Sequence, residues 1–182
     1  SSSRQPTPYF GYGSNLWRDQ MRHRCPSSSY LGLARLKNYH WIINKRGYAN
    51  VVEITTSSSS SNADNEKDVV WGLVYTLDKK DEAQLDKNEG VPKTYTKEMI
   101  EVEFWEKGEE GKALNIRKKP ETRKMLVYIN RTLTSGDFKP KEEYVHRMNM
   151  GIADALKEGV PRKYVEKVLR HWIPEEEEEN AR

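Results

Sequence analysis

The sequence predicts an α+β fold with a largely antiparallel or mixed sheet that can curl into a small barrel. Segments with the β-branched, aromatic or alternating pattern of strands outnumber those with helical periodicity. They also follow one another without the regular crossover helices of a doubly wound α/β fold. No internal repeat or second domain is visible, so residues 1–174 are expected to form a single domain, followed by a short acidic tail.

The first third of the chain is predicted to be mostly strand. A short strand at 8–12 leads into a glycine-containing turn, and 16–24 follows as a short helix. Aromatic and β-branched residues then predict strands at 30–36, 39–44 and 49–55. Residues 56–68 are polar and Ser-rich without an apolar period, so we expect a mobile loop there.

A continuous apolar run at 69–77 predicts a strand that is buried on both faces. Asp78 is a suitable N-cap for a helix over 79–88, and Gly90 suits the position at or just past its end. In 96–105, apolar Ile100, Val102 and Phe104 alternate with other residues, and this pattern predicts a half-buried strand.

The last third combines one strand with two helices. Residues 122–130 are strand-like. Apolar residues then recur at intervals of three and four, which predicts an amphipathic helix that ends at Gly159; they are Val145, Met148, Ile152 and Leu156. Pro161 is expected as the first residue of a last helix that reaches about residue 172, and the acidic residues 175–182 as a disordered tail.

Composition limits the classes of function. The charged fraction is 32% and the mean hydropathy is −0.95, the longest apolar run is far too short to cross a membrane, and Cys25 is the lone cysteine. These features, with an N-terminus that lacks a signal-peptide core, predict a cytoplasmic protein that does not associate with membranes. The net charge is +3, but residues 175–182 hold five Glu and one Arg, so residues 1–174 carry +7. Because Lys and Arg are scattered along the chain, small anionic ligands are expected rather than nucleic acid.

The turn 9-YFGYGSNL-16 has two interpretations from its residues alone. Gly11 and Gly13 can simply permit unusual backbone angles at a strand end. Alternatively, a turn between strand and helix points backbone N–H groups at an anion, and Gly13 removes the Cβ that would block its approach. The stretch lacks the lysine and the spacing of a phosphate-binding loop, and its residues leave both interpretations open.

Three stretches together resemble the gamma-glutamylcyclotransferase family. They are YFGYGSNL, 70-VWGLVYTLDKKDEAQLDKNEGV-91, and Tyr144 with 148-MNMGIADALKEGVPRKYVEKV-168, which occur in the right order over nearly the whole chain. The segment 43-INKRGYANVVE-53 is similar to fungal members, some of which act in sulfur-containing secondary metabolism. The chain departs from the family pattern at Gly11, where alanine is commoner, and in the Ser-rich stretch near 57–61, which looks like an insertion.

The resemblance implies a small mixed β-barrel with flanking helices and an enzyme that releases 5-oxoproline and a free amine from a small gamma-glutamyl substrate. It implies neither a metal nor an organic cofactor. It places the catalytic acid/base on Glu89 and assigns substrate binding to Tyr12, Gly13, Ser14, Asn15, Leu16, Tyr95 and Tyr144. Glu89 lies at the end of the predicted helix, where the helix dipole disfavours a carboxylate and should raise its pKa.

Other interpretations have weaker support. A thiol nucleophile at Cys25, with His23 or His40, has no recognisable sequence context, and the four His lack metal-ligand spacing. Trp71, Trp105, Met148 and Met150 are expected to pack in the interior. A non-catalytic binding module with the same pocket is the alternative to an enzyme. The leaving amine, the oligomeric state (monomer or homodimer) and whether loop 56–68 selects substrates as a lid or is a solvated linker stay open.

Overall fold

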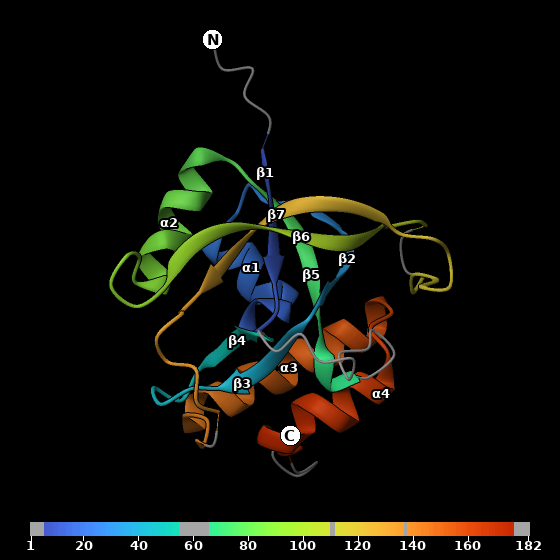
Figure 1. The fold of residues 1–182 in the computed structure, drawn as a ribbon. Helices are drawn as coiled ribbons and strands as arrows, with labels where there is room; N and C mark the ends of the chain where they lie inside the picture. The colour runs from blue at the N-terminus through green and yellow to red at the C-terminus, as the bar shows by residue number, and fades with distance from the viewer. Residues whose placement is uncertain (1–5, 55–65, 110–111, 137, 177–182) are drawn as a thin grey trace.

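Five strands close into a barrel in the order β1-β5-β2-β6-β7 (Figure 1). They are β1 (Thr7–Gly11), β2 (Tyr30–Lys37), β5 (Val69–Leu77), β6 (Thr96–Glu106) and β7 (Glu121–Ile129). Neighbours are antiparallel except β1 and β7, which form a parallel pair at Tyr9 and Leu126. The computed structural model describes residues 6–54, 66–109, 112–136 and 138–176. The predicted α+β fold with a mixed, barrel-forming sheet is confirmed.

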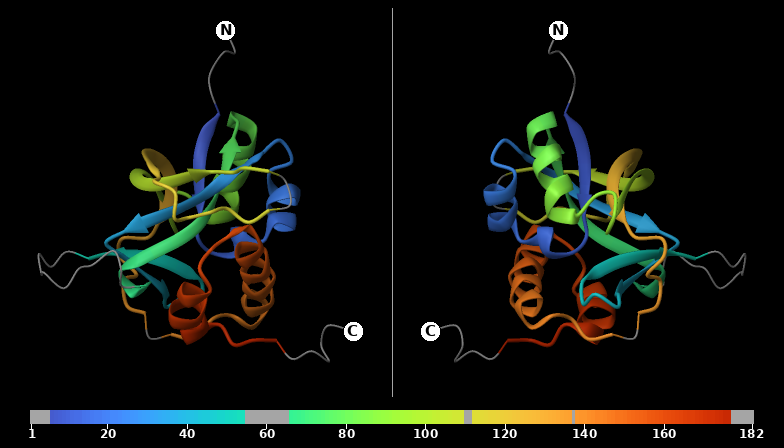
Figure 2. Two further views of the ribbon diagram at one scale, coloured as in Figure 1. Left: turned by 90° about the vertical axis from the view of Figure 1, so that its right-hand side faces the viewer. Right: turned by 90° about the vertical axis from the view of Figure 1, so that its left-hand side faces the viewer.

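A two-stranded hairpin and several helices surround the barrel. The hairpin consists of β3 (Tyr39–Ile43) and β4 (Ala49–Glu53). The helices are η1 (Ser14–Leu16), α1 (Arg18–Arg24), η2 (Glu66–Asp68), α2 (Lys79–Glu89), α3 (Glu142–Glu158) and a last segment of α4 (Arg162–Tyr164), η3 (Val165–Leu169) and α5 (Arg170–Trp172). Figures 1 and 2 show α2 at one end of the molecule, and α3 with the last segment at the other.

The position of β5 between two other strands explains why its sequence is almost entirely apolar. It lies between β1 and β2, and every residue in it is buried except the half-buried Thr76. Because side chains alternate between the two faces of a strand, a run without polar interruptions needs cover on both faces. Trp71 of this strand stacks on Trp105 at 5.2 Å between ring centroids, and both rings are buried, as predicted.

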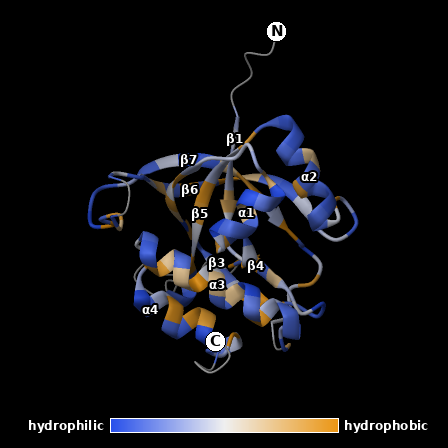
Figure 3. Ribbon diagram, turned by 180° about the vertical axis from the view of Figure 1, so that it is seen from behind, coloured by the Kyte–Doolittle hydropathy of each residue, from blue (hydrophilic) through white to orange (hydrophobic). Residues whose placement is uncertain are grey.

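The predicted ends of α2 are confirmed. The Asp78 carboxylate accepts a hydrogen bond from the N–H of Asp81 at 2.8 Å, and Gly90 takes the left-handed conformation with φ of 67°. Figure 3 shows that α2 is mostly hydrophilic, in agreement with a helix that contributes only Leu85 as a buried apolar side chain. The last residue of this helix is Glu89.

Helix α3 buries the face that its periodicity predicts, including Met148 and Ile152, and ends at Gly159. The expectation for Met150 is wrong, because its side chain is 38% exposed. Two residues along a helix correspond to a rotation of about 200°, which turns Met150 away from the face that holds Met148.

The last helical segment begins one residue later than predicted, because Pro161 is its N-cap with extended backbone angles. It contains a π-helical turn and continues to Trp172. Within the segment predicted as a loop, Glu66–Asp68 form a 3-10 helix, while residues 56–65 lie outside the described part of the chain, as do 177–182 of the acidic tail. Within the described residues, no helix combines the length and apolar character needed to cross a membrane.

Candidate active site

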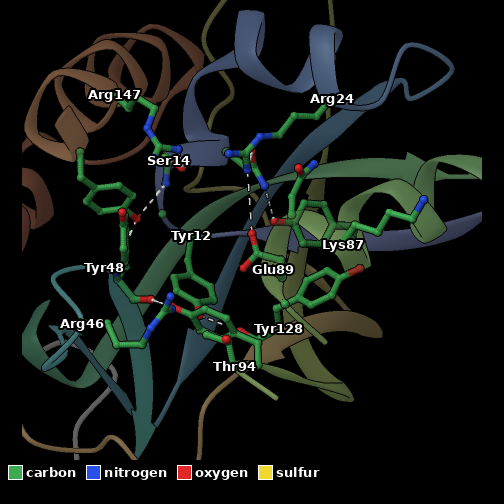
Figure 4. Close-up of a pocket in the computed structure, with 18 residues that line it drawn as sticks. Tyr12, Ser14, Arg24, Arg46, Tyr48, Lys87, Glu89, Thr94, Tyr128 and Arg147 are labelled. Carbon is green, nitrogen blue, oxygen red and sulfur yellow. Dashed lines mark hydrogen bonds and ion pairs between the residues drawn. The ribbon is translucent and has the colours of Figure 1, made fainter. Parts of the chain in front are cut away.

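A pocket of about 270 Å³ lies where the β1–η1 turn, the β3–β4 hairpin and the end of α2 meet (Figure 4). Helices α1 and α3 and strand β7 complete its wall through Arg24, Arg147 and Tyr128. Of the side chains predicted for the site, the pocket brings together Tyr12, Gly13, Ser14, Asn15, Glu89, Tyr95 and Tyr144. Leu16 does not line it: this side chain is buried in the core, and the position of a Cβ on Gly151 of α3 would lie 2.9 Å from its own Cβ. Segments far apart in the sequence therefore form one cavity.

Glu89 projects into the pocket from the last position of α2, with 20% of its side chain exposed. Burial raises the pKa of its carboxyl group, and the guanidinium groups of Arg24, Arg147 and Arg46 oppose this shift. Of the three, Arg24 also forms an ion pair with Glu89, with 3.9 Å between Arg24 Nη1 and Glu89 Oε2. The pKa is therefore raised in the predicted direction, and burial by the surrounding chain is the largest cause.

Gly13 lies directly against the Tyr144 hydroxyl, and this contact explains why a glycine is needed. A Cβ on Gly13 would lie 2.7 Å from the Tyr144 hydroxyl and 3.2 Å from Ala49 Cβ. The Tyr144 hydroxyl in turn accepts hydrogen bonds from the N–H groups of Ser14 at 3.2 Å and Ala49 at 3.4 Å. With both acceptor positions of the oxygen used, its own proton is available to a bound ligand.

The turn also presents backbone donors. The N–H groups of Gly13 and Asn15 donate to no acceptor in the part of the chain that the structure describes, and both residues line the pocket. A turn with successive N–H groups of this kind suits an anionic oxygen. The geometry supports the anion-binding interpretation of this stretch.

The side chains of the turn are held from behind by Gln20 of α1, which is 9% exposed. Its Nε2 donates to Ser14 Oγ at 2.9 Å and to Asn15 Oδ1 at 2.8 Å. Asn15 Nδ2 donates to the Tyr9 hydroxyl at 2.9 Å. Sequence reasoning missed Gln20, because nothing in its local pattern distinguishes it from a surface glutamine.

Tyr12 and Tyr95 form part of the pocket wall, and the hydroxyl group of each already donates a hydrogen bond within the protein. Tyr12 donates to the carbonyl of Tyr128 at 2.6 Å, and Tyr95 donates to the carbonyl of Ala49 at 2.7 Å. Burial raises the pKa of both phenols, so they stay neutral and shape the cavity.

The charged lining is mostly basic, and sequence reasoning missed these residues too. Arg24, Arg46, Lys87 and Arg147 line the pocket, and Glu89 is the single acid among the described lining residues. The surplus of +7 on residues 1–174 was the available signal, but it did not say which cations converge. The arrangement favours a ligand that carries negative charge.

The competing catalytic groups lie elsewhere. Cys25 is fully buried, its Sγ lies 3.7 Å from the carbonyl oxygen of Asp81, and burial raises the pKa of the thiol to about 12, which makes it a poor nucleophile. Among the described residues, no three His, Cys, Asp or Glu side chains gather as metal ligands.

Comparison with known proteins gives concordant results. A family model described as "AIG2-like family" matches residues 69–168. A mouse protein named gamma-glutamylcyclotransferase is 28% identical over 167 residues, which cover 88% of this chain and 76% of the relative. The human protein of the same name is 29% identical over 164 residues, with the same two shares.

Solved structures share the fold. A structure described as gamma-glutamyl cyclotransferase superimposes with a TM-score of 0.66 at 23% identity, covering 95% of this chain and 90% of that one. A mouse AIG2-like protein superimposes with a TM-score of 0.51 at 16% identity, covering 78% of this chain and 84% of that one. The barrel with its flanking helices is therefore the architecture of these structures as well.

Proposed function

This chain belongs to the AIG2-like family, and from that membership and the pocket geometry we propose that it is a gamma-glutamylcyclotransferase. It acts on a gamma-glutamyl amino acid or gamma-glutamyl conjugate, as a lyase that releases 5-oxoproline and a free amine. We place this activity in one catalytic domain formed by residues 1–174.

The observation that carries the proposal is the position of Glu89. A carboxylate whose pKa is raised by burial faces a small cavity in which the other charged lining groups of the described chain are cationic. A carboxyl group whose pKa is raised in this way is suited to accept and return a proton during the reaction. The cationic groups attract a substrate with carboxylates, and the three arginines among them oppose the raised pKa of Glu89.

The reaction needs proton transfer more than any other chemistry. The α-nitrogen of the substrate arrives as an ammonium group, and Glu89 removes a proton from it so that the nitrogen can attack the γ-carbonyl carbon. A C–N bond forms in the new five-membered ring, and the C–N bond to the leaving amine breaks after Glu89 delivers a proton to its nitrogen. The α-nitrogen loses two protons in all and the leaving nitrogen gains two, so the reaction requires no co-reactant.

Binding supplies the rest of the rate enhancement. The free N–H groups of Gly13 and Asn15 and the Tyr144 hydroxyl hold anionic oxygens of the substrate, either the α-carboxylate or the developing oxyanion. The tyrosine walls keep the glutamyl chain folded. Because both reacting groups belong to one molecule, correct orientation can lower the barrier by about 7–11 kcal/mol.

The direct test is an assay of 5-oxoproline release from a panel of gamma-glutamyl compounds with different leaving amines, combined with calorimetric binding of the same compounds. Catalytic release of 5-oxoproline from at least one compound supports the enzyme. Binding to this pocket with no release from any compound would favour a non-catalytic binding module instead.

A further inference from the structure

Arg46 is a cation of the pocket lining to which the proposed reaction assigns no specific contact with the substrate. It lies in the turn between β3 and β4, is exposed to solvent, and lines the cavity from the hairpin side. Figure 4 shows its side chain on the other side of Glu89 from Arg24, whereas Lys87 extends away from the cavity. Arg46 therefore faces a part of the cavity that the anion-binding turn does not occupy.

The backbone of the turn holds Arg46 in a defined position. The Asn44 side-chain oxygen accepts the N–H of Arg46 at 3.0 Å, and the Asn44 carbonyl accepts the N–H of Gly47 at 2.8 Å. Gly47 has φ of 88°, and a Cβ there would lie 3.0 Å from the backbone nitrogen of Lys141, so the turn is also packed against the chain before α3. A hairpin turn fixed at both ends limits the directions its arginine can take.

The other two arginines have protein partners, whereas Arg46 has none of opposite charge. Arg147 pairs with Glu143 at 2.9 Å, and Arg24 lies 3.9 Å from Glu89. Within the described chain Arg46 forms no ion pair, and its guanidinium lies over the Tyr48 ring at 5.5 Å from the centroid. Tyr48 itself is held by a hydrogen bond to Glu143 at 2.9 Å, so the ring is a fixed support for the cation.

The weak effect of Arg46 on Glu89 also fits a role in binding. Of the three guanidinium groups that oppose the raised pKa of Glu89, Arg46 has the smallest effect. It is near enough for its charge to act in the cavity and forms no ion pair with Glu89. A group bound between them would meet Glu89 at one end and Arg46 at the other.

We propose that the Arg46 guanidinium binds a carboxylate carried by the leaving amine and so selects gamma-glutamyl amino acids over gamma-glutamyl amines that lack this charge. This inference rests on the proposed cyclotransferase reaction. The turn at Gly13 and Asn15 holds the glutamyl end, and Glu89 must reach both reacting nitrogens, so the substituent on the leaving nitrogen extends beyond Glu89. A planar guanidinium without a protein carboxylate is suited to a bidentate pair with a substrate carboxylate.

The test compares gamma-glutamyl-L-alanine with gamma-glutamyl-L-alaninamide, which has the same shape without the negative charge. Arg46→Gln should lower kcat/KM for the acid by roughly 10- to 100-fold, the usual effect of losing a charge-assisted pair. It should leave the amide within about twofold of wild type. Any change in the pKa of Glu89 affects both substrates alike and cancels in their ratio.

Lys45→Gln is the matched control, because Lys45 is exposed in the same turn and does not line the pocket. It should change neither substrate. Equal losses for acid and amide in Arg46→Gln, or no loss for either, would overturn the role assigned to Arg46. The proposed function is tested separately: it fails if wild type releases no 5-oxoproline from any gamma-glutamyl compound of the panel. Calorimetry then decides on Arg46, since the preference for binding the acid must disappear in Arg46→Gln.

Discussion

At the scale of single residues, the site depends on how the chain surrounds one carboxyl group. Glu89 is an ordinary last residue of a hydrophilic helix, yet burial raises its pKa while three guanidinium groups oppose the shift. A carboxyl group under two opposing effects of this kind suits the proton transfer that we propose for it. Replacing either Glu89 or a guanidinium group that acts on it should therefore change turnover or its pH dependence measurably.

Replacing Glu89 by glutamine keeps the shape of the side chain and removes its basicity. Turnover should fall by at least the roughly 10²–10⁴-fold attributed to general acid–base catalysis, measured as kcat for 5-oxoproline release.

The Glu89→Gln variant should still fold, because a neutral group avoids the cost of a buried charge. Since the folded pKa is raised above the unfolded value, that cost grows as the pH rises from the unfolded pKa to the folded pKa, and it vanishes at low pH. Thermal unfolding should therefore show Glu89→Gln at least as stable as wild type at neutral pH. Near-normal turnover in a folded variant would rule out this role.

Removing Arg24 should move the pH profile in a predictable direction. Its guanidinium is the strongest of the groups that lower the pKa of Glu89, so Arg24→Met should raise that pKa further. The acid limb of the kcat/KM profile, where activity falls as Glu89 gains a proton, should shift to higher pH. Arg22→Met is the control, because Arg22 lies on the same helix, is 64% exposed and pairs with Asp19. An unshifted limb in Arg24→Met would mean that another group controls it.

At the scale of elements, the site is a contact between a turn and a distant helix. Turn and helix meet where the Tyr144 hydroxyl of α3 accepts the N–H of Ser14, and Arg147 donates to Ser14 Oγ at 3.2 Å. The contact tolerates no side chain at Gly13. Gln20 then fixes the side chains of the turn from the opposite side. Helices α1 and α3 thus hold the backbone donors of the turn in place before any ligand arrives.

Adding a side chain at this contact should damage the site more than the fold. Gly13→Val places a Cβ 2.7 Å from the Tyr144 hydroxyl, so either the turn or Tyr144 must move, and kcat/KM should fall by about 10²-fold or more. Gly108→Val is the control, because a Cβ there meets no heavy atom within 4 Å. Circular dichroism should show both variants folded. Normal kinetics in Gly13→Val would leave the turn with only a conformational role.

At the scale of the whole molecule, the hairpin must be fixed to the barrel for the pocket to exist. Trp41 of β3 makes this connection: it is 1% exposed, its indole N–H donates to the carbonyl of Tyr12 at 2.9 Å, and its ring meets Trp172 at 5.6 Å. One side chain therefore joins the hairpin, the turn between β1 and η1, and the last helix. Both Arg46 and the Ala49 carbonyl depend on the position of this hairpin.

Trp41→Ala should lower the free energy of unfolding by about 3–5 kcal/mol, since it leaves a large cavity and a buried carbonyl without its donor. Urea denaturation followed by circular dichroism measures this loss. Met99→Ala is the control, because Met99 is 52% exposed and its removal should change stability by about 0.5 kcal/mol or less. A small loss in Trp41→Ala would show that other contacts hold the hairpin.

Local patterns in the sequence were enough to predict most elements. The apolar run of β5, the alternation in β6, and the cap residues Asp78 and Gly90 are short-range signals, and the structure confirms them. Met150 failed because apolar character alone does not say which way a helical side chain points. The resemblance to fungal members, and the behaviour expected of residues 56–65, stay predictions.

By itself the sequence determined the fold class, the elements and, through its resemblance to a family, the candidate residues Glu89, Gly13 and Tyr144. Only the tertiary structure decided that Arg24, Arg46 and Arg147 converge on one cavity, that Gln20 fixes the turn, and that Leu16 belongs to the core. The physical reason is the different separation along the chain over which the two kinds of interaction act. Periodicity and capping act over a few residues of the chain, whereas the burial and charge that set the pKa of Glu89 come from side chains brought together by barrel closure and helix packing.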